Sequence, residues 1–132
     1  MSKSYQNAIN LSDSPEEVTA KVKLMFTDPA RVRRSDPGHP EQCNVHSYYQ
    51  VFAPELCEQV DGWCRRAEKG CTDCKLLLAE RLLERLAPIQ EKRAQFQQDP
   101  SRIVDILAAG KTRARQIAGA TLAEVKEAVF GS

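Results

Sequence analysis

Five cysteines lie within residues 43–74, and the rest of the sequence contains none. Cys64, Cys71 and Cys74 form the densest part of this group, with the spacing Cys-x6-Cys-x2-Cys. Thiolates are soft ligands that suit zinc and iron–sulfur clusters, and four of them complete an all-cysteine shell. The sequence therefore predicts a four-cysteine metal site, with Cys64, Cys71 and Cys74 as three ligands and either Cys43 or Cys57 as the fourth.

The residues around these cysteines predict how the thiols are presented. Gly70 is placed to end one helix, and Cys71 and Cys74 open the next, where backbone N–H groups at a helix N-terminus favour the thiolate form. Cys64 then comes from the last turn of the preceding helix. Because Cys57 and Cys64 are seven residues apart, they are nearly aligned on that helix, and the residues alone leave the fourth ligand open.

Other interpretations of the cysteines remain. Free cysteine is among the most buried residue types, so five ordinary packed thiols are the main alternative. A disulfide scaffold is disfavoured by the odd count, by the lack of a signal-peptide pattern and by the long amphipathic helices. His46 is a further candidate ligand, but a lone histidine among aromatic residues is more simply packed or exposed.

Length and charge set broad limits. The chain has 132 residues, one domain's worth, with 19 basic and 18 acidic side chains, so any nucleic-acid surface must be local. No apolar run approaches the roughly 20 residues that a membrane span needs. We therefore expect a cytoplasmic protein with no membrane partner.

Helix signals predict an all-α fold, a helical bundle, and no strand pattern persists beyond a few residues. Ser14, Pro15 and Glu17 form a capping box, and Asp99 followed by Pro100 is a second helix start. In the first half of the chain we expect a short helix from Pro15 to about Thr27, a helix with an aromatic face after Cys43, and a helix over residues 55–69. A long helix should follow from Cys71 to Ile89, and Pro88 should kink or divide it. The last two expected helices are one from Pro100 and a short one from a further capping box at Thr121 to just before Gly131.

Two basic clusters are candidate contacts for RNA. Arg31, Arg33 and Arg34 can contact phosphate or form a solvated face. Lys111, Arg113 and Arg115 flank the apolar stripe of the helix from Pro100 with little acid nearby, which suits an RNA backbone, although no aromatic residue lies among them to stack bases.

The N-terminal segment resembles a known signature. Met1-Ser2-Lys3-Ser4 is similar to the second signature loop of class I aminoacyl-tRNA synthetases, Lys-Met-Ser-Lys-Ser, without its first lysine. Motifs that follow in order resemble the bacterial tryptophanyl-tRNA synthetases over essentially the whole chain: Pro15-Glu16-Glu17-Val18, Thr27-Asp28-Pro29, Asp36-Pro37-Gly38, Pro40-Glu41-x-Cys43-Asn44-Val45, Gly70-Cys71-Thr72-Asp73-Cys74-Lys75 and Ala118-x2-Thr121-Leu122-x2-Val125.

This resemblance implies a fold and a metal site. Residues 1–10 would be the truncated loop, and residues 11–132 the helical anticodon-binding domain with its metal site at 43–74. A subgroup of the family holds a [4Fe-4S] cluster with four cysteines ending in Cys-x6-Cys-x2-Cys, which implies Cys43, Cys64, Cys71 and Cys74 as ligands. Cys57 is then not a ligand by resemblance, although its alignment with Cys64 on one helix keeps it as the alternative to Cys43 for the fourth ligand position.

The resemblance also implies an activity for the full enzyme. That enzyme is a homodimer that activates L-tryptophan with ATP and transfers it to tRNA(Trp). Lys3 would be catalytic by supplying positive charge as pyrophosphate leaves, with Met1, Ser2, Lys3 and Ser4 near ATP. This chain contains neither the nucleotide-binding domain nor its His-Ile-Gly-His-like signature, so we expect it to have no ligase activity alone and to retain RNA binding at most. Because the homodimer is built largely through the missing domain, this chain can be monomeric.

Two alternatives belong to other functional classes. One is a free-standing RNA-binding module without ligase chemistry. The other is a four-cysteine zinc domain whose metal holds helices together for a protein partner.

Overall fold

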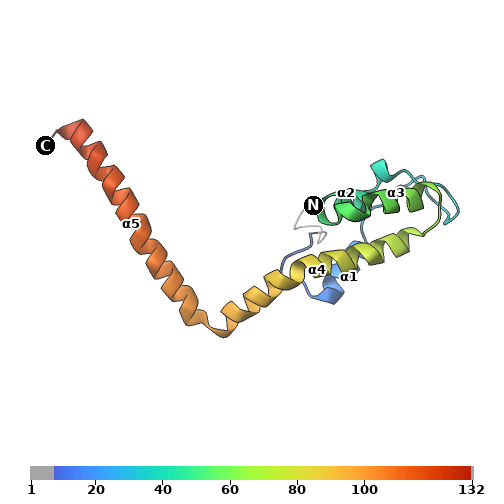
Figure 1. The fold of residues 1–132 in the computed structure, drawn as a ribbon, viewed down its shortest axis with the longest axis horizontal. Coiled ribbons are helices and arrows are strands. Elements are labelled where there is room, and N and C mark those ends of the chain that lie inside the picture. The colour runs from blue at the N-terminus through green and yellow to red at the C-terminus, as the bar shows by residue number, and fades with distance from the viewer. Residues whose placement is uncertain (1–7, 132) are drawn as a thin grey trace. The chain divides into compact units, whose positions relative to one another are not determined.

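The computed structural model describes residues 8–131, and in this part of the chain every regular element is helical (Figure 1). The all-α prediction is therefore confirmed. The elements, in order, are α1 (Pro15–Lys23), the 3₁₀ turn η2 (Pro40–Gln42), α2 (Asn44–Phe52), the 3₁₀ turn η3 (Pro54–Leu56), α3 (Cys57–Arg65), α4 (Cys71–Gln98) and α5 (Pro100–Phe130).

The capping box predicted for α1 is present. The Ser14 hydroxyl accepts a hydrogen bond from the Glu17 amide at 3.3 Å, and the Glu17 carboxylate accepts one from the Ser14 amide at 2.7 Å. Val18 and Val22 are four residues apart and so share one face of α1, and both are fully buried. The expected end near Thr27 is wrong, because α1 ends at Lys23, where the Leu24 amide already donates to carbonyls within the last turn.

The residues between Cys43 and Cys71 form two short helices. Tyr49 on α2 is fully buried, and its hydroxyl donates a 2.7 Å hydrogen bond to the Cys74 carbonyl of α4. The predicted extent of the next helix to residue 69 is wrong, because α3 ends at Arg65. Ala67 adopts a left-handed conformation with φ 54°, so the chain leaves the helix well before Gly70.

The helix α4 starts at Cys71, as predicted, but Gly70 does not end the helix before it, because α3 already ends at Arg65. The Gly70 amide donates to the Asp73 carboxylate at 3.1 Å. The helix continues through Pro88 to Gln98, so of the two effects expected of Pro88, a kink or a division, the division is excluded.

The helix α5 begins as the sequence predicts, because the Asp99 carboxylate accepts a hydrogen bond from the Arg102 amide at 3.3 Å. The predicted separate helix starting at Thr121 is wrong. The Thr121 hydroxyl instead donates to the Ile117 carbonyl one turn earlier, an arrangement of a helix interior. Gly131 follows the helix with φ 68°, the left-handed conformation that favours glycine there.

The chain divides into two compact units, one ending at Gln90 and the other starting at Glu91. Among the described residues, every buried apolar side chain lies in the first unit, where the core comprises Val18, Val22, Val45, Tyr49, Ala53, Val60, Cys74, Leu78, Ala79, Leu82 and Leu86. No helix in residues 8–131 is both long and apolar enough to cross a membrane.

Candidate metal centre

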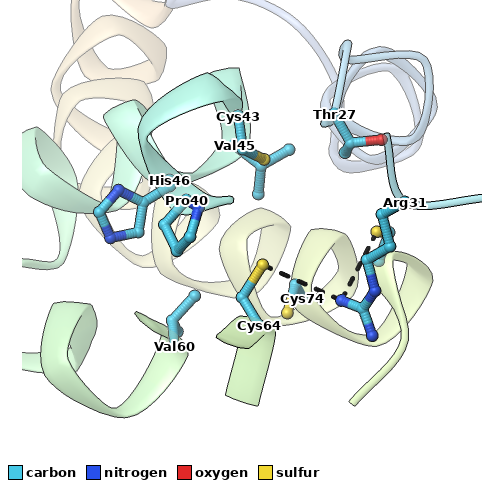
Figure 2. Close-up of a pocket in the computed structure, with 10 residues that line it drawn as sticks. Thr27, Arg31, Pro40, Cys43, Val45, His46, Val60, Cys64 and Cys74 are labelled. Carbon is cyan, nitrogen blue, oxygen red and sulfur yellow. Dashed lines mark hydrogen bonds between the residues drawn. The ribbon is translucent and has the colours of Figure 1, made fainter. Parts of the chain in front are cut away.

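Four thiols line one cavity in the first unit. Cys43 precedes α2, Cys64 lies in the last turn of α3, and Cys71 and Cys74 lie in the first turn of α4 (Figure 2). The remaining walls are Thr27, Arg31, Pro40, Val45, His46 and Val60. Two helices, α3 and α4, and the connection that leads into α2 therefore present the predicted thiols to one space.

Cys57 does not line this cavity. It begins α3, and its thiol lies 3.9 Å from the Ala53 carbonyl in the preceding turn. The seven-residue spacing of Cys57 and Cys64 on α3 therefore does not bring both thiols to the cavity. Of the two candidates for the fourth position, the structure brings only Cys43 to the other three thiols.

Arg31 contributes the positive charge beside the thiols. One of its guanidinium nitrogens, Nη1, lies 4.0 Å from Cys64 Sγ and 3.9 Å from Cys71 Sγ. Figure 2 shows this side chain directed from the connection after α1 towards the sulfur of Cys64. The sequence assigned Arg31 only to a basic cluster, and no spacing signal placed it next to cysteines that come more than 30 residues later.

Burial dominates the acidity of two of the thiols. The pKa of Cys74 is raised to about 11, mainly by desolvation, with smaller contributions from the neighbouring thiols Cys64 and Cys71. Burial likewise raises the pKa of Cys64, against a lowering by Arg31. Burial and the neighbouring thiols therefore oppose the thiolate form of Cys74, whereas the helix start was expected to favour it.

The connection between α1 and α2 is tied down around the site at three points. The buried Asp28 carboxylate accepts hydrogen bonds from the amides of Ala30 at 2.9 Å and His39 at 2.8 Å, and also contacts His39 Nδ1. The Gly38 amide donates to the Cys64 carbonyl at 2.9 Å, while Arg31 donates to the Lys69 carbonyl. These ties hold the connection against α3 and the start of α4.

Gly38 is a close neighbour of the thiols that the sequence signalled only as part of a turn. An ideal Cβ built on Gly38 would lie 2.5 Å from Cys64 Sγ and 3.2 Å from Arg31 Cδ. The lack of a side chain at Gly38 therefore leaves the room that the Cys64 thiol occupies.

His46 also lines the cavity, although the sequence favoured a packed or exposed role. Its Nε2 lies 3.9 Å from the Asp61 carboxylate, and its side chain is 14% exposed. Trp63 packs against the core, and the Lys69 ammonium lies 5.5 Å from its ring centroid.

The donor set suits a thiolate-bound metal, but the side chains are not in ligating positions. In residues 8–131 no group of three or more His, Cys, Asp or Glu side chains is arranged to hold one metal ion. The space between the thiols is about 20 Å³, room for about one water molecule. A larger centre requires the thiols to turn outward, which cysteine can do by changing one rotamer.

The other predicted site residues lie elsewhere. Lys111, Arg113 and Arg115 are exposed on α5, in the second unit. Met1, Ser2, Lys3 and Ser4, predicted to lie near ATP with Lys3 as the catalytic group, fall outside the described residues.

Comparisons with known proteins identify the family. A family model described as class I tRNA synthetases (W and Y) matches residues 1–87. The chain is 44% identical to a tryptophan–tRNA ligase of Thermotoga maritima and 41% identical to one of Aquifex aeolicus. Each match covers 98% of this chain, but only 40% and 33% of the respective relative.

A solved structure agrees with these matches. The tryptophanyl-tRNA synthetase of Campylobacter jejuni, complexed with ADP and tryptophan, superposes with a TM-score of 0.83 at 26% identity. The match covers 98% of this chain and 40% of that chain. This chain belongs to the class I tRNA synthetases of the tryptophan and tyrosine type.

Proposed function

We propose that this chain is the RNA-binding helical portion of a tryptophan–tRNA ligase, and that Cys43, Cys64, Cys71 and Cys74 hold a [4Fe-4S] cluster within it. The observation that carries the cluster is that these four thiols line one cavity while Cys57 lies outside it. The specificity for tryptophan and its tRNA is supported by the similarity to tryptophan–tRNA ligases, whose matches cover 98% of this chain.

The chemistry of the four donors supports a metal-bound state. Four thiolates cannot share an apolar cavity without a compensating charge, and the raised pKa values of Cys64 and Cys74 express that cost. A bound metal deprotonates its coordinating thiols outright. When bound, the cluster supplies a cross-link between α3, α4 and the start of α2, with no catalytic role in ligation.

The cysteine spacing Cys-x6-Cys-x2-Cys, which resembles that of the cluster-holding subgroup, is the reason to propose an iron–sulfur cluster instead of a single zinc ion. Zinc requires all four sulfurs about 2.3 Å from one point. No three candidate ligands in the described residues are arranged in this way, and the space of about 20 Å³ between the thiols is too small for a cluster, so either centre requires the thiols to turn. A [4Fe-4S] cluster is held by four cysteines on four irons, so its ligands surround a larger body.

Anaerobic purification followed by iron, sulfide and zinc analysis and a visible spectrum tests the cluster. We expect about four irons per chain and a broad absorption band. Cys43→Ser should abolish both, whereas Cys57→Ser, the matched control, should retain them. Stoichiometric zinc without colour would replace the cluster with the zinc-domain alternative, and protein free of metal would reduce the site to packed thiols.

The RNA-binding role has a separate test. Fluorescence anisotropy with labelled tRNA(Trp) and a non-cognate tRNA of equal length should show tighter binding of the cognate molecule. Equal binding of both would favour a general RNA-binding module, and no binding of either would overturn the RNA-binding proposal.

In the complete ligase, the chain would act together with a nucleotide-binding domain. We propose L-tryptophan, ATP and tRNA(Trp) as substrates, a homodimeric assembly and a cytoplasmic location. Lys3 would stabilise the charge that develops as pyrophosphate leaves, with Met1, Ser2 and Ser4 beside ATP. The 132-residue chain alone should give no tryptophan-dependent ATP–pyrophosphate exchange, and measurable exchange would overturn this assignment of the chemistry to the other domain.

A further inference from the structure

A second, more polar hollow lies next to the thiol cavity, and we call it the arginine groove. Arg31, Arg33 and Arg34 line one side of it, and residues 70–73 at the beginning of α4 line the other. Its volume is about 370 Å³, larger than one phosphate group needs. The groove lies entirely within the first unit.

Two of the three arginines of this groove have no partner for their guanidinium groups in the described part of the chain. The guanidinium groups of Arg33 and Arg34 are exposed and have no ion pair or hydrogen bond within residues 8–131. Arg65 and Arg66 differ, because each of them pairs with a carboxylate. Two unpaired arginines side by side are therefore available to an anion from outside the chain.

Arg31 fixes the shape of the groove. Its Nη2 donates to the Arg34 carbonyl at 2.9 Å and to the Lys69 carbonyl at 2.7 Å. These two bonds fasten the arginine-bearing loop to the segment that leads into α4. The same guanidinium lies beside the thiols of Cys64 and Cys71, so one side chain borders both the groove and the thiol cavity.

The opposite wall adds unpaired amides. Gly70 precedes α4 and has no side chain to accept hydrogen bonds, and the amides of Cys71, Thr72 and Asp73 find no acceptor among the described residues. Such amides at the start of a long helix favour an anion. The Asp73 carboxylate opposes this effect, but it accepts a hydrogen bond from the Gly70 amide, and three arginines line the same groove.

We propose that the arginine groove binds a backbone phosphodiester of RNA, with Arg33 and Arg34 as the contacting side chains and Arg31 as the residue that positions their loop. Guanidinium groups match phosphate oxygens in pairs, and the volume of the groove leaves room for an adjoining ribose. The proposal rests on the RNA-binding role proposed above and places it at a particular surface.

The test measures the salt dependence of tRNA(Trp) binding to the full chain. Each phosphate neutralised contributes close to one unit to the slope of log affinity against log salt. We expect Arg33→Gln/Arg34→Gln to lower that slope by about 1 to 2 and to weaken binding at least about tenfold near 0.1 M salt. Arg33→Lys/Arg34→Lys should retain most of the slope because it keeps the charge.

A matched control removes the same charge elsewhere. Arg65→Gln/Arg66→Gln takes away two exposed arginines that already pair with carboxylates, so it should leave the slope unchanged. Circular dichroism should show all three variants folded, since none changes a buried side chain. Phosphate-alkylation interference would locate the contact on the RNA. Alkylation of one or two phosphates should weaken binding to the wild-type chain, and alkylation of the same phosphates should have no effect on binding to Arg33→Gln/Arg34→Gln.

The outcomes separate the two proposals. Binding by the wild type with an identical slope in Arg33→Gln/Arg34→Gln would overturn the groove and leave the RNA-binding role standing. Equal weakening by the Arg65→Gln/Arg66→Gln control would also overturn it, because net charge alone would then explain the effect. A wild-type chain that does not bind tRNA would overturn the RNA-binding role and the groove together.

Discussion

Gly38 shows how a single missing side chain shapes the thiol site. Because a Cβ at this position would lie 2.5 Å from Cys64 Sγ, Gly38→Ala must displace that thiol or the tied loop. We expect a loss of about 1–3 kcal/mol of stability, the usual cost of overpacking. Thermal unfolding would measure the stability, and metal analysis would show reduced loading through misplacement of Cys64.

Gly110 on α5 offers the matched control, because nothing lies within 4 Å of a Cβ built there. Gly110→Ala should stabilise the helix by about 0.5–1 kcal/mol. A Gly38→Ala protein as stable and as well loaded as the wild type would show that Cys64 can turn aside without cost.

Asp28 gives the site a pH dependence of its own. Burial raises the pKa of its carboxyl, but hydrogen bonds from His39 and Ala30 lower it more, so the folded pKa lies below the ordinary value. The charged carboxylate therefore contributes stability above its unfolded pKa of about 4, and that contribution is lost as the pH falls through the folded value.

Asp28→Asn should accordingly unfold at lower urea concentration than the wild type at pH 7, with the difference shrinking as the pH falls below about 4. Urea titrations at several pH values would measure this. Asp105→Asn, which changes an exposed carboxylate on α5, should leave the wild-type curve unchanged. A pH-independent difference for Asp28→Asn would show that the charge of Asp28 does not stabilise the loop.

Among the elements, local signals predicted helix beginnings better than helix ends. Ser14 and Asp99 cap helices as expected because an N-cap is a short-range hydrogen bond that the sequence spells out. The end of α3 at Arg65 depends on Ala67 adopting a left-handed conformation, which no glycine marks. Pro88 and Thr121 carry helix-boundary signals, yet both lie inside long helices.

Thr121 allows a direct test of which signal holds. If α5 is continuous, Thr121→Ala replaces a poor helix former with the best one and should raise stability by a few tenths of a kcal/mol. If Thr121 capped a separate helix, the same change would cost about 1 kcal/mol. Ser14→Ala provides the comparison, because it removes a cap that is present and should cost about 1 kcal/mol in thermal unfolding.

The thiol site was partly predictable from the sequence for a related reason. Cys64, Cys71 and Cys74 meet because a helix end and a helix start are close along the chain. The arrival of Cys43, Arg31 and Gly38 depends on the fold of the long connection after α1, whose ties are hydrogen bonds to residues far away in sequence. Tertiary contacts of this kind produce no repeating pattern in the amino-acid sequence from which they could be predicted.

At the scale of the whole molecule, the two units differ in how they are stabilised. All buried apolar side chains of the described residues lie at or before Leu86, whereas α5 has no buried residue. Helix α5 also exposes large apolar side chains such as Ile103, Leu107 and Ile117. The buried apolar core and the thiol cavity therefore consist of residues of the first unit.

A chain truncated after Gln98 should thus keep the cooperative unfolding and the metal content of the 132-residue chain while losing the helical signal of α5. Calorimetry, metal analysis and far-UV circular dichroism would measure the three quantities. The same truncation removes Lys111, Arg113 and Arg115, so a lower salt slope for tRNA binding would assign phosphate contacts to that rim. An unchanged slope would place the RNA contacts in the first unit, whereas a truncated chain that fails to unfold cooperatively would show that α5 supports the core after all.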